Sequence, residues 1–163
     1  TYAVLHYPQY KAKYELNLKR EFPHIPFYDD FQKWAAYGKA LMNLHIEYET
    51  AEPYPLEQID EELKKGSLIV AKLKVKKEEG IIVLDSKTEL HGVPPQAWAY
   101  RLGNRSALEW VLDQYKEKKI RDKTLREKFN TYRFADYKEQ VIDLLKRVCT
   151  VSVKTMKILG EMK

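Results

Sequence analysis

The chain has 163 residues, of which 44% are hydrophobic and 12% aromatic, so it can bury a core and is not a disordered tail. Its 29 lysines and arginines exceed its 24 acidic residues, and the net charge of +5 is compatible with a polyanionic partner without being diagnostic of one. The single cysteine, Cys149, allows no internal disulfide, and no apolar run is long enough to span a membrane. We therefore expect a cytoplasmic protein with no membrane partner and a buried, structural Cys149.

The N-terminal stretch predicts short helices followed by a connector. Residues 1–6 read as the end of a helix that Pro8 stops, and residues 9–20 read as a second helix. Residues 22–27 contain two prolines, which remove backbone donors and favour extended geometry. We expect a stiff, apolar connector there that packs onto the rest of the chain.

A long core helix is predicted next. Asp29 is a suitable N-cap, because Gln32 follows three residues later. Gly38 lies within the apolar stripe and indicates the close approach of another backbone, while His45 is expected to be a hydrogen-bonded core histidine. The other members of the stripe are Phe31, Trp34, Ala35, Leu41, Met42 and Tyr48.

The middle of the chain changes from helical to strand-like patterning. Residues 47–65 carry seven carboxylates against two lysines and predict an acidic connector with one helical turn at residues 56–63. Residues 69–76 then alternate between apolar and polar side chains, which predicts a half-buried strand. We expect residues 81–84 to be its hairpin partner and residues 88–91 to add a third strand.

A turn at residues 103–104 leads directly into another helix. Ser106 occupies the expected N-cap position, and Glu109 follows at the spacing of a capping box. Cationic and amide donors around this turn suit a phosphate or the edge of a base, although they could equally be surface groups on a left-handed turn. These donors are Arg101, Asn104 and Arg105.

The last part of the chain contains a basic segment and a long helix. Residues 116–133 carry eight basic against three acidic side chains with weak periodicity, which predicts a loop or a short exposed helix. Residues 136–159 fit a helix in spite of the β-branched residues at 148–153, and Gly160 is its expected end. Together the elements predict one α+β domain, mostly helical, with a small antiparallel sheet.

Two groups of cations favour nucleic acid as a ligand. A strand at residues 69–76 places three lysines on one face, where they could follow a phosphate backbone or protect a sheet edge from aggregation. Residues 116–133 mix cations with aromatic side chains, which favours nucleic acid over a membrane. The two groups consist of Lys72, Lys74, Lys76, Arg121, Lys123, Arg126 and Lys128.

Signatures of catalysis or metal binding are weak. The four histidines lack the spacing of metal ligands, and the sequence contains no glycine-rich phosphate loop. Asp85-Ser86-Lys87 follows a predicted strand in the manner of metal-dependent nucleases, with Glu78 or Asp60 as candidate second acids. Such tripeptides arise readily by chance in so charged a chain, so we expect neither a catalytic site nor a metal site.

Several motifs resemble one known family, and they occur in the order that this family has. They are YAVLHYPQY at 2–10, Leu18-Lys19, FPHIP at 22–26, LGNRSALEW at 102–110, LLKRV at 144–148 and TVSV at 150–153. The earlier motifs resemble the segment that follows the methyltransferase core of type ISP restriction–modification enzymes. The later motifs resemble the C-terminal specificity domain of the same enzymes, while His24 stands where the family pattern has arginine.

The resemblance implies that residues 1–163 are the target recognition domain of a larger polypeptide, with residues 1–28 connecting it to an upstream methyltransferase domain. Such enzymes join a nuclease, an ATP-driven translocase and an adenine methyltransferase to the recognition domain. The expected partners are double-stranded DNA and that upstream methyltransferase domain. We expect no cofactor in this chain, whereas the parent protein would use S-adenosylmethionine, ATP and Mg²⁺.

The resemblance also implies a division of roles among the candidate residues. Family members with different DNA targets share the run at residues 103–110, so this run is expected to build the scaffold of the domain. Arg101, Asn104 and Arg105 would then support or position the DNA-contacting parts. Sequence choice is expected to fall to the lysine-bearing hairpin and to residues 116–133. An interaction module that docks on the methyltransferase domain with little DNA contact is the alternative, and a nuclease built on Asp85 is a third hypothesis.

Overall fold

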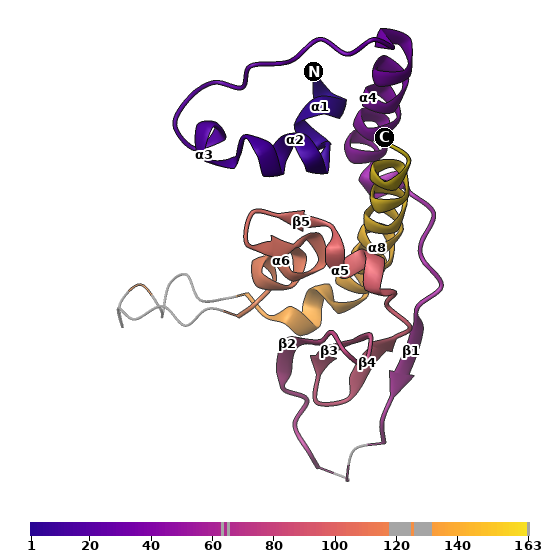
Figure 1. The fold of residues 1–163 in the computed structure, drawn as a ribbon. Helices are drawn as coiled ribbons and strands as arrows, with labels where there is room; N and C mark the ends of the chain where they lie inside the picture. Colours follow the sequence, from indigo (N-terminus) through magenta and orange to yellow (C-terminus); the bar gives the residue numbers. More distant parts are fainter. Residues whose placement is uncertain (63, 65, 118–124, 126–131, 163) are drawn as a thin grey trace.

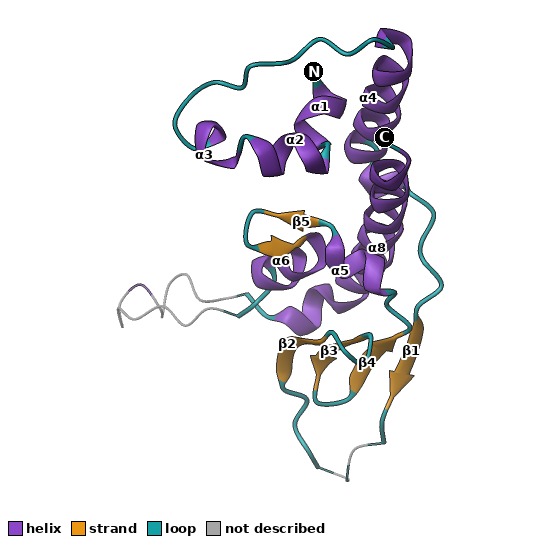
Figure 2. Cartoon of the chain, in the orientation of Figure 1, coloured by secondary structure: helices purple, strands orange, loops and turns teal. Residues whose placement is uncertain are grey.

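A computed structural model of the chain describes all residues except 63, 65, 118–124, 126–131 and 163. A helical part and a four-stranded sheet lie at opposite ends of one long helix, α8 (Lys138–Glu161) (Figure 1). The four-stranded sheet lies at one end of the molecule, while a separate two-stranded hairpin lies among the helices (Figure 2). The predicted α+β class, mostly helical with a small antiparallel sheet, is confirmed.

Three short helices open the chain: α1 (Tyr2–His6), α2 (Pro8–Lys13) and α3 (Glu15–Leu18). Pro8 follows the end of α1, as predicted, and also begins α2, where its missing N–H is not needed. The single helix predicted over residues 9–20 is wrong. The backbone leaves helical geometry at Tyr14, with φ −112° and ψ 19°, and a separate turn follows.

The connector at residues 22–27 is not helical, as its prolines predict, but it stays largely exposed and is tied to α2 by the Tyr10 hydroxyl, which donates to the His24 carbonyl at 2.8 Å. Phe22 and Phe27 are almost completely exposed to solvent. An aromatic cluster fills the space between the first helices and the next one without a contribution from the connector. This cluster consists of Tyr7, Tyr28 and Trp34.

Helix α4 (Phe31–Ile46) packs against α1. Its N-cap is Asp30, one residue after the predicted position, and the Asp30 carboxylate accepts the backbone N–H of Lys33 at 2.9 Å. The predicted close approach at Gly38 is confirmed, because a Cβ there would lie 3.4 Å from the backbone nitrogen of Ala3.

The sheet is formed by β1 (Glu57–Asp60), β2 (Ala71–Lys76), β3 (Ile81–Asp85) and β4 (Thr88–His91). Its strand order is β1-β4-β3-β2, and every neighbouring pair is antiparallel. The predicted hairpin and third strand are confirmed. The helical turn predicted at residues 56–63 is wrong, because residues 57–60 pair with β4 as an edge strand.

The remaining described elements are short. They are the 3₁₀ turn η1 (Tyr48–Thr50), α5 (Pro95–Ala99), β5 (Arg101–Leu102), β6 (Arg105–Ser106), α6 (Ala107–Gln114) and the 3₁₀ turn η2 (Phe134–Tyr137). Helix α8 includes the β-branched stretch at residues 148–153, as predicted. It also continues through Gly160, so the predicted end at that residue is wrong.

Two clusters of buried side chains share α8. The larger one packs the sheet, α5 and α6 against the first half of α8, and the smaller one packs α1, α2 and α4 against its C-terminal end. Cys149 is buried in the larger cluster, as predicted, and this burial raises the pKa of its thiol to about 12. In the part of the chain that the structure describes, no helix is long and apolar enough to cross a bilayer.

Candidate nucleic-acid interface

Strand β2 lies at one edge of the sheet and carries the predicted row of lysines. Lys72, Lys74 and Lys76 are exposed, while the alternate residues Leu73 and Val75 face the core. Lys74 and Lys76 share a face as predicted, because both lie in the regular part of the pairing with β3, whereas a shift in register interrupts the alternation at Lys72. The pairing with β3 is irregular between Ala71 and Lys74, so the strand bends at this edge.

The three lysines differ in their surroundings. The ammonium of Lys76 lies 3.4 Å from the carboxylate of Glu89 and 3.8 Å from that of Glu79. Within the described ranges of the chain, Lys72 and Lys74 form no ion pair. These two ammonium groups therefore remain available to an external anion, whereas Lys76 already has acidic neighbours.

Two grooves flank the exposed side of β2, and cations line both. The smaller groove, of about 330 Å³, is lined by Lys74, Arg105 and Lys116 together with the acids Glu109 and Asp113. The larger groove, of about 550 Å³, is lined by Lys72, Lys116 and Arg133 together with the acid Glu117. The basic edge, as we call it, consists of Lys72, Lys74, Lys116 and Arg133, of which Lys116 also lies 3.6 Å from the carboxylate of Asp113.

The opposite edge of the sheet carries the opposite charge. Strand β1 and the residues after it expose four carboxylates to solvent, and they come from the acidic stretch of the sequence. A polyanion would therefore be repelled from the β1 edge and attracted to the β2 edge. The exposed acids are Glu57, Asp60, Glu61 and Glu62.

The turn at Gly103 holds its arginines in place through local contacts. Gly103 has φ +68°, a left-handed conformation that glycine adopts without strain. Arg101 donates to the backbone carbonyl of Asn104, and the indole N–H of Trp110 donates to the carbonyl of Leu102 at 2.7 Å. Arg101 and Asn104 line neither of the two grooves beside β2.

Arg105 is the one residue of this turn that reaches the basic edge. Its guanidinium pairs with Asp113 at 2.9 Å and lies 5.1 Å from the ring centroid of Trp110. The pair compensates part of its charge. Arg105 therefore shapes the wall of the smaller groove more than it adds positive charge to it.

The predicted capping box fixes the start of α6. The Ser106 hydroxyl accepts the backbone N–H of Glu109, and the Glu109 carboxylate accepts the backbone N–H of Ser106 at 2.9 Å. Burial would raise the pKa of Glu109, but the Ser106 N–H and the Lys77 ammonium outweigh burial and lower it to about 2. This box positions Arg105, the neighbour of Ser106, beside the smaller groove.

The predicted contacts at Arg121, Lys123, Arg126 and Lys128 lie outside the described residues. The described ends of that segment do reach the site, since Lys116 and Arg133 both line the larger groove. Near them, the Tyr132 hydroxyl donates to the Tyr115 carbonyl at 2.9 Å. The basic segment therefore begins and ends beside β2.

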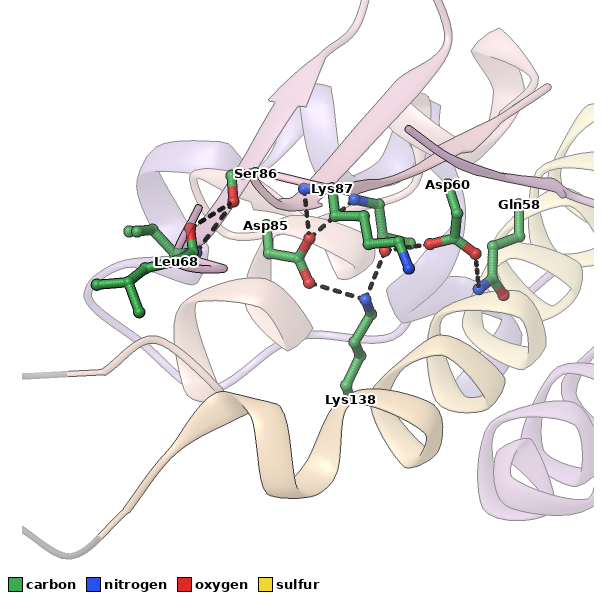
Figure 3. Close-up of polar contacts among 9 residues, drawn as sticks. Gln58, Asp60, Leu68, Asp85, Ser86, Lys87 and Lys138 are labelled. Carbon is green, nitrogen blue, oxygen red and sulfur yellow. Dashed lines mark hydrogen bonds and ion pairs between the residues drawn. The ribbon is translucent and has the colours of Figure 1, made fainter. Parts of the chain in front are cut away.

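Asp85, the centre of the nuclease hypothesis, belongs to a buried polar network (Figure 3). It is only 3% exposed, and its carboxylate pairs with the Lys138 ammonium at 2.9 Å while accepting the N–H groups of Lys87 and Thr88. Thr88 in turn donates to Asp60. Burial would raise the pKa of Asp85, but Lys138 and the backbone donors hold it below its usual value.

This network supports a structural role for Asp85, because its carboxylate is fully engaged by neighbouring groups. Among the residues that the structure describes, no three histidine, cysteine or carboxylate side chains gather in a way that could hold a metal ion. The feature of the described residues that suits an anionic ligand is the basic edge beside β2.

A family model described as the type ISP C-terminal specificity domain matches residues 1–144. The chain belongs to this family. The match covers the connector, the sheet, the turn at Gly103 and the first part of α8. The resemblance of the sequence motifs to this family is therefore confirmed.

Solved structures are similar to this type ISP specificity domain along almost its whole length. A DrdV–DNA complex contains a chain with a TM-score of 0.94 and 56% identity over 99% of the domain. The type ISP restriction–modification enzyme LlaBIII bound to DNA has a TM-score of 0.77 and 27% identity over 99% of the domain. A nuclease-deletion mutant of the type ISP enzyme LlaGI, in complex with a DNA substrate mimic, has a TM-score of 0.77 and 28% identity over 99% of the domain.

The specificity domain corresponds to a minor part of these larger chains. It spans 17% of the DrdV chain, 10% of the LlaBIII chain and 15% of the LlaGI chain. No curated protein matches the sequence.

Proposed function

We propose that the chain recognises a short sequence in double-stranded DNA, as the specificity module of a single-polypeptide restriction–modification enzyme. The observation that carries this proposal is the membership in a specificity-domain family, together with a 56% identical chain in a DrdV–DNA complex. Methylation, cleavage and ATP-driven translocation would then belong to other parts of a longer polypeptide. S-adenosylmethionine, ATP and Mg²⁺ would bind in those parts.

The geometry of the β2 edge supports this role. Duplex DNA is a dense row of phosphates, and lysines that neutralise phosphates gain affinity through the release of counterions. Lys72 and Lys74 have no acidic partner among the described residues, and Lys116 and Arg133 extend the same edge. An edge strand with its hairpin partner also has dimensions that fit the major groove.

The turn at Gly103 contributes to this function indirectly. Arg105 is paired with Asp113, and Arg101 donates to the Asn104 carbonyl, so each holds a neighbouring part of the turn or of α6. We assign them the support of α6 and of the smaller groove. This assignment agrees with the role that the family resemblance implies for the same residues.

The salt dependence of binding tests the proposal. The 163-residue chain is titrated with a labelled duplex at several salt concentrations, alongside the double variant Lys72→Ala/Lys74→Ala. Loss of two phosphate contacts is expected to make the slope of log K against log salt shallower by about 2. The control Lys39→Ala removes an exposed lysine of α4, far from β2, and should leave the slope unchanged.

Two results would contradict the proposal. One is binding that does not depend on salt, which is the expectation for a module that docks on a protein and touches little DNA. The other is an equal effect of Lys39→Ala and of the β2 variant, which would indicate a diffuse charge effect.

A further inference from the structure

Three consecutive aliphatic side chains lie exposed immediately before the basic edge. Leu68, Ile69 and Val70 are 84%, 57% and 58% exposed. Neighbouring exposed aliphatic side chains form an apolar patch, and such patches mark binding surfaces more often than scattered ones do. We call residues 68–70 the apolar ledge.

The ledge is fixed to the sheet by one serine, as Figure 3 shows for Leu68 and Ser86. The backbone N–H of Val70 donates to the Ser86 hydroxyl at 3.1 Å, and the Ser86 N–H donates to the Val70 carbonyl at 2.9 Å. The Ser86 hydroxyl also donates to the Leu68 carbonyl at 3.5 Å. The backbone of the ledge is therefore held, and its side chains remain free to meet a ligand.

The support of the ledge continues into the polar network around Asp85. Ser86 directly follows Asp85, whose carboxylate is held by Lys138 of α8 and by the N–H groups of Lys87 and Thr88. The tripeptide that resembled a nuclease motif thus anchors the ledge to the sheet. A preorganised surface loses less conformational entropy when it binds.

The groove beside the ledge indicates the charge of its ligand. Leu68, Ile69 and Val70 line the groove of about 550 Å³ together with Lys72, Lys116 and Arg133. One acid, Glu117, also lines this groove, and its carboxylate already accepts the backbone N–H of Phe134 at 2.9 Å. Apolar side chains between cations suit a ligand with apolar groups between phosphates, which favours DNA over an apolar protein surface.

We propose that the apolar ledge is a base-reading element that contacts the 5-methyl groups of thymines in the major groove, while Lys72, Lys116 and Arg133 hold the flanking phosphates. The thymine methyl is the apolar group that the major groove presents, and aliphatic side chains recognise it by contact. This inference rests on the proposed function and adds to it the chemical group that is read.

The test begins with the sequence that the wild-type chain selects from a pool of randomised duplexes. Each thymine of that sequence is then replaced in turn by deoxyuridine, which removes only the methyl group. At one or two positions we expect a loss of affinity of about four-fold, which corresponds to ~0.8 kcal/mol for one buried methyl group. The variant Ile69→Ser should bind the thymine and uracil duplexes equally well at one of these positions.

Ile46→Ser provides the matched control, because Ile46 is also an exposed isoleucine, 70% exposed at the end of α4. It should retain the full discrimination between thymine and uracil. Circular dichroism of both variants, with thermal unfolding, checks that neither substitution disturbs the fold.

Several results would overturn the inference while leaving the proposed function intact. They are a selected sequence without A·T pairs, equal affinity for every uracil duplex, and undiminished discrimination by Ile69→Ser. A ledge variant that binds every duplex normally but no longer binds the other parts of the polypeptide would make the ledge a protein-docking surface. If the wild-type chain selects no sequence at all, the proposed function itself fails, and the inference fails with it.

Discussion

At the scale of single residues, ion pairs decide which cations of the molecule can meet a ligand. Lys76, Arg105 and Lys116 each have an acidic neighbour. Lys72 and Lys74 are not engaged by any acid in the described ranges, so they are the cations most available to a ligand. The sequence predicts the shared face of the lysines, because side chains alternate along a strand. It does not predict that Lys76 meets Glu89, since that pair depends on how β3 and β4 fold back.

The buried ion pair of Asp85 and Lys138 gives the first residue-scale prediction. Asp85→Ala leaves the ammonium of Lys138, whose side chain is 18% exposed, without its carboxylate partner. Loss of one partner of a buried pair destabilises a protein by about 3–5 kcal/mol, so we expect a decrease of that order in the free energy of unfolding by urea. The exposed pair of Asp143 and Arg147 is the control, and Asp143→Ala should cost at most about 1 kcal/mol. Equal effects of the two substitutions would contradict the structural role of Asp85.

His45 gives a prediction for pH dependence. Burial lowers its pKa to about 4, with a further contribution from His6, while its ring nitrogens contact the hydroxyls of Tyr2 and Thr155 at 2.7 and 2.9 Å. Between pH 4 and about 6.5 the unfolded chain binds a proton at His45 that the folded chain does not bind. Stability should therefore fall as the pH drops through this window.

His45→Gln tests that expectation, because glutamine keeps hydrogen-bonding groups but does not titrate. Urea unfolding at several pH values between 4 and 7 should show a weaker pH dependence for the variant than for the wild type. Two other groups face His45: His6, whose pKa burial also lowers, and Tyr100, whose pKa burial raises to about 12. Tyr100 does not titrate in this window, and His6 leaves a residual slope. An unchanged slope in His45→Gln would contradict the assignment.

At the scale of secondary structure elements, the accuracy of the predictions follows the strength of the local signals. The capping box of α6 and the β2–β3 hairpin have clear local signatures, and both form as predicted. Strand β1 has none, since its four residues are all exposed and its pairing with β4 is nonlocal. The apolar stripe of α4 is narrower than predicted, because Phe31 and Met42 have no neighbouring element to cover them.

The capping box of α6 gives the element-scale prediction. Ser106→Ala removes the hydroxyl that accepts the Glu109 N–H, and a lost N-cap typically costs about 1 kcal/mol. We expect that decrease in stability in thermal unfolding and a small loss of DNA affinity through the displaced Arg105. Ser106→Thr keeps the hydroxyl and should be close to wild type. A threonine variant as unstable as the alanine variant would indicate that packing, and not the cap, holds this position.

At the scale of the whole molecule, α8 links a helical part to a sheet with two oppositely charged edges. The charge segregation is visible in the sequence as an acidic stretch at residues 47–65 and a basic one at 116–133. The fold places the acidic strand β1 at one edge of the sheet and the lysine-bearing strand β2 at the other, so the two charges lie on opposite sides of the sheet. Sequence reasoning could not give this arrangement, because it missed β1 and with it the strand order.

The central claim is that the chain selects a DNA sequence, and selection from a randomised duplex pool tests it most directly. The 163-residue chain is incubated with the pool at near-physiological salt, and the bound duplexes are sequenced over successive rounds. We expect one short sequence to become enriched, and we expect the Lys72→Ala/Lys74→Ala variant to enrich the same sequence with lower yield. A bound pool that stays as random as the input, with the wild-type chain folded, would contradict it.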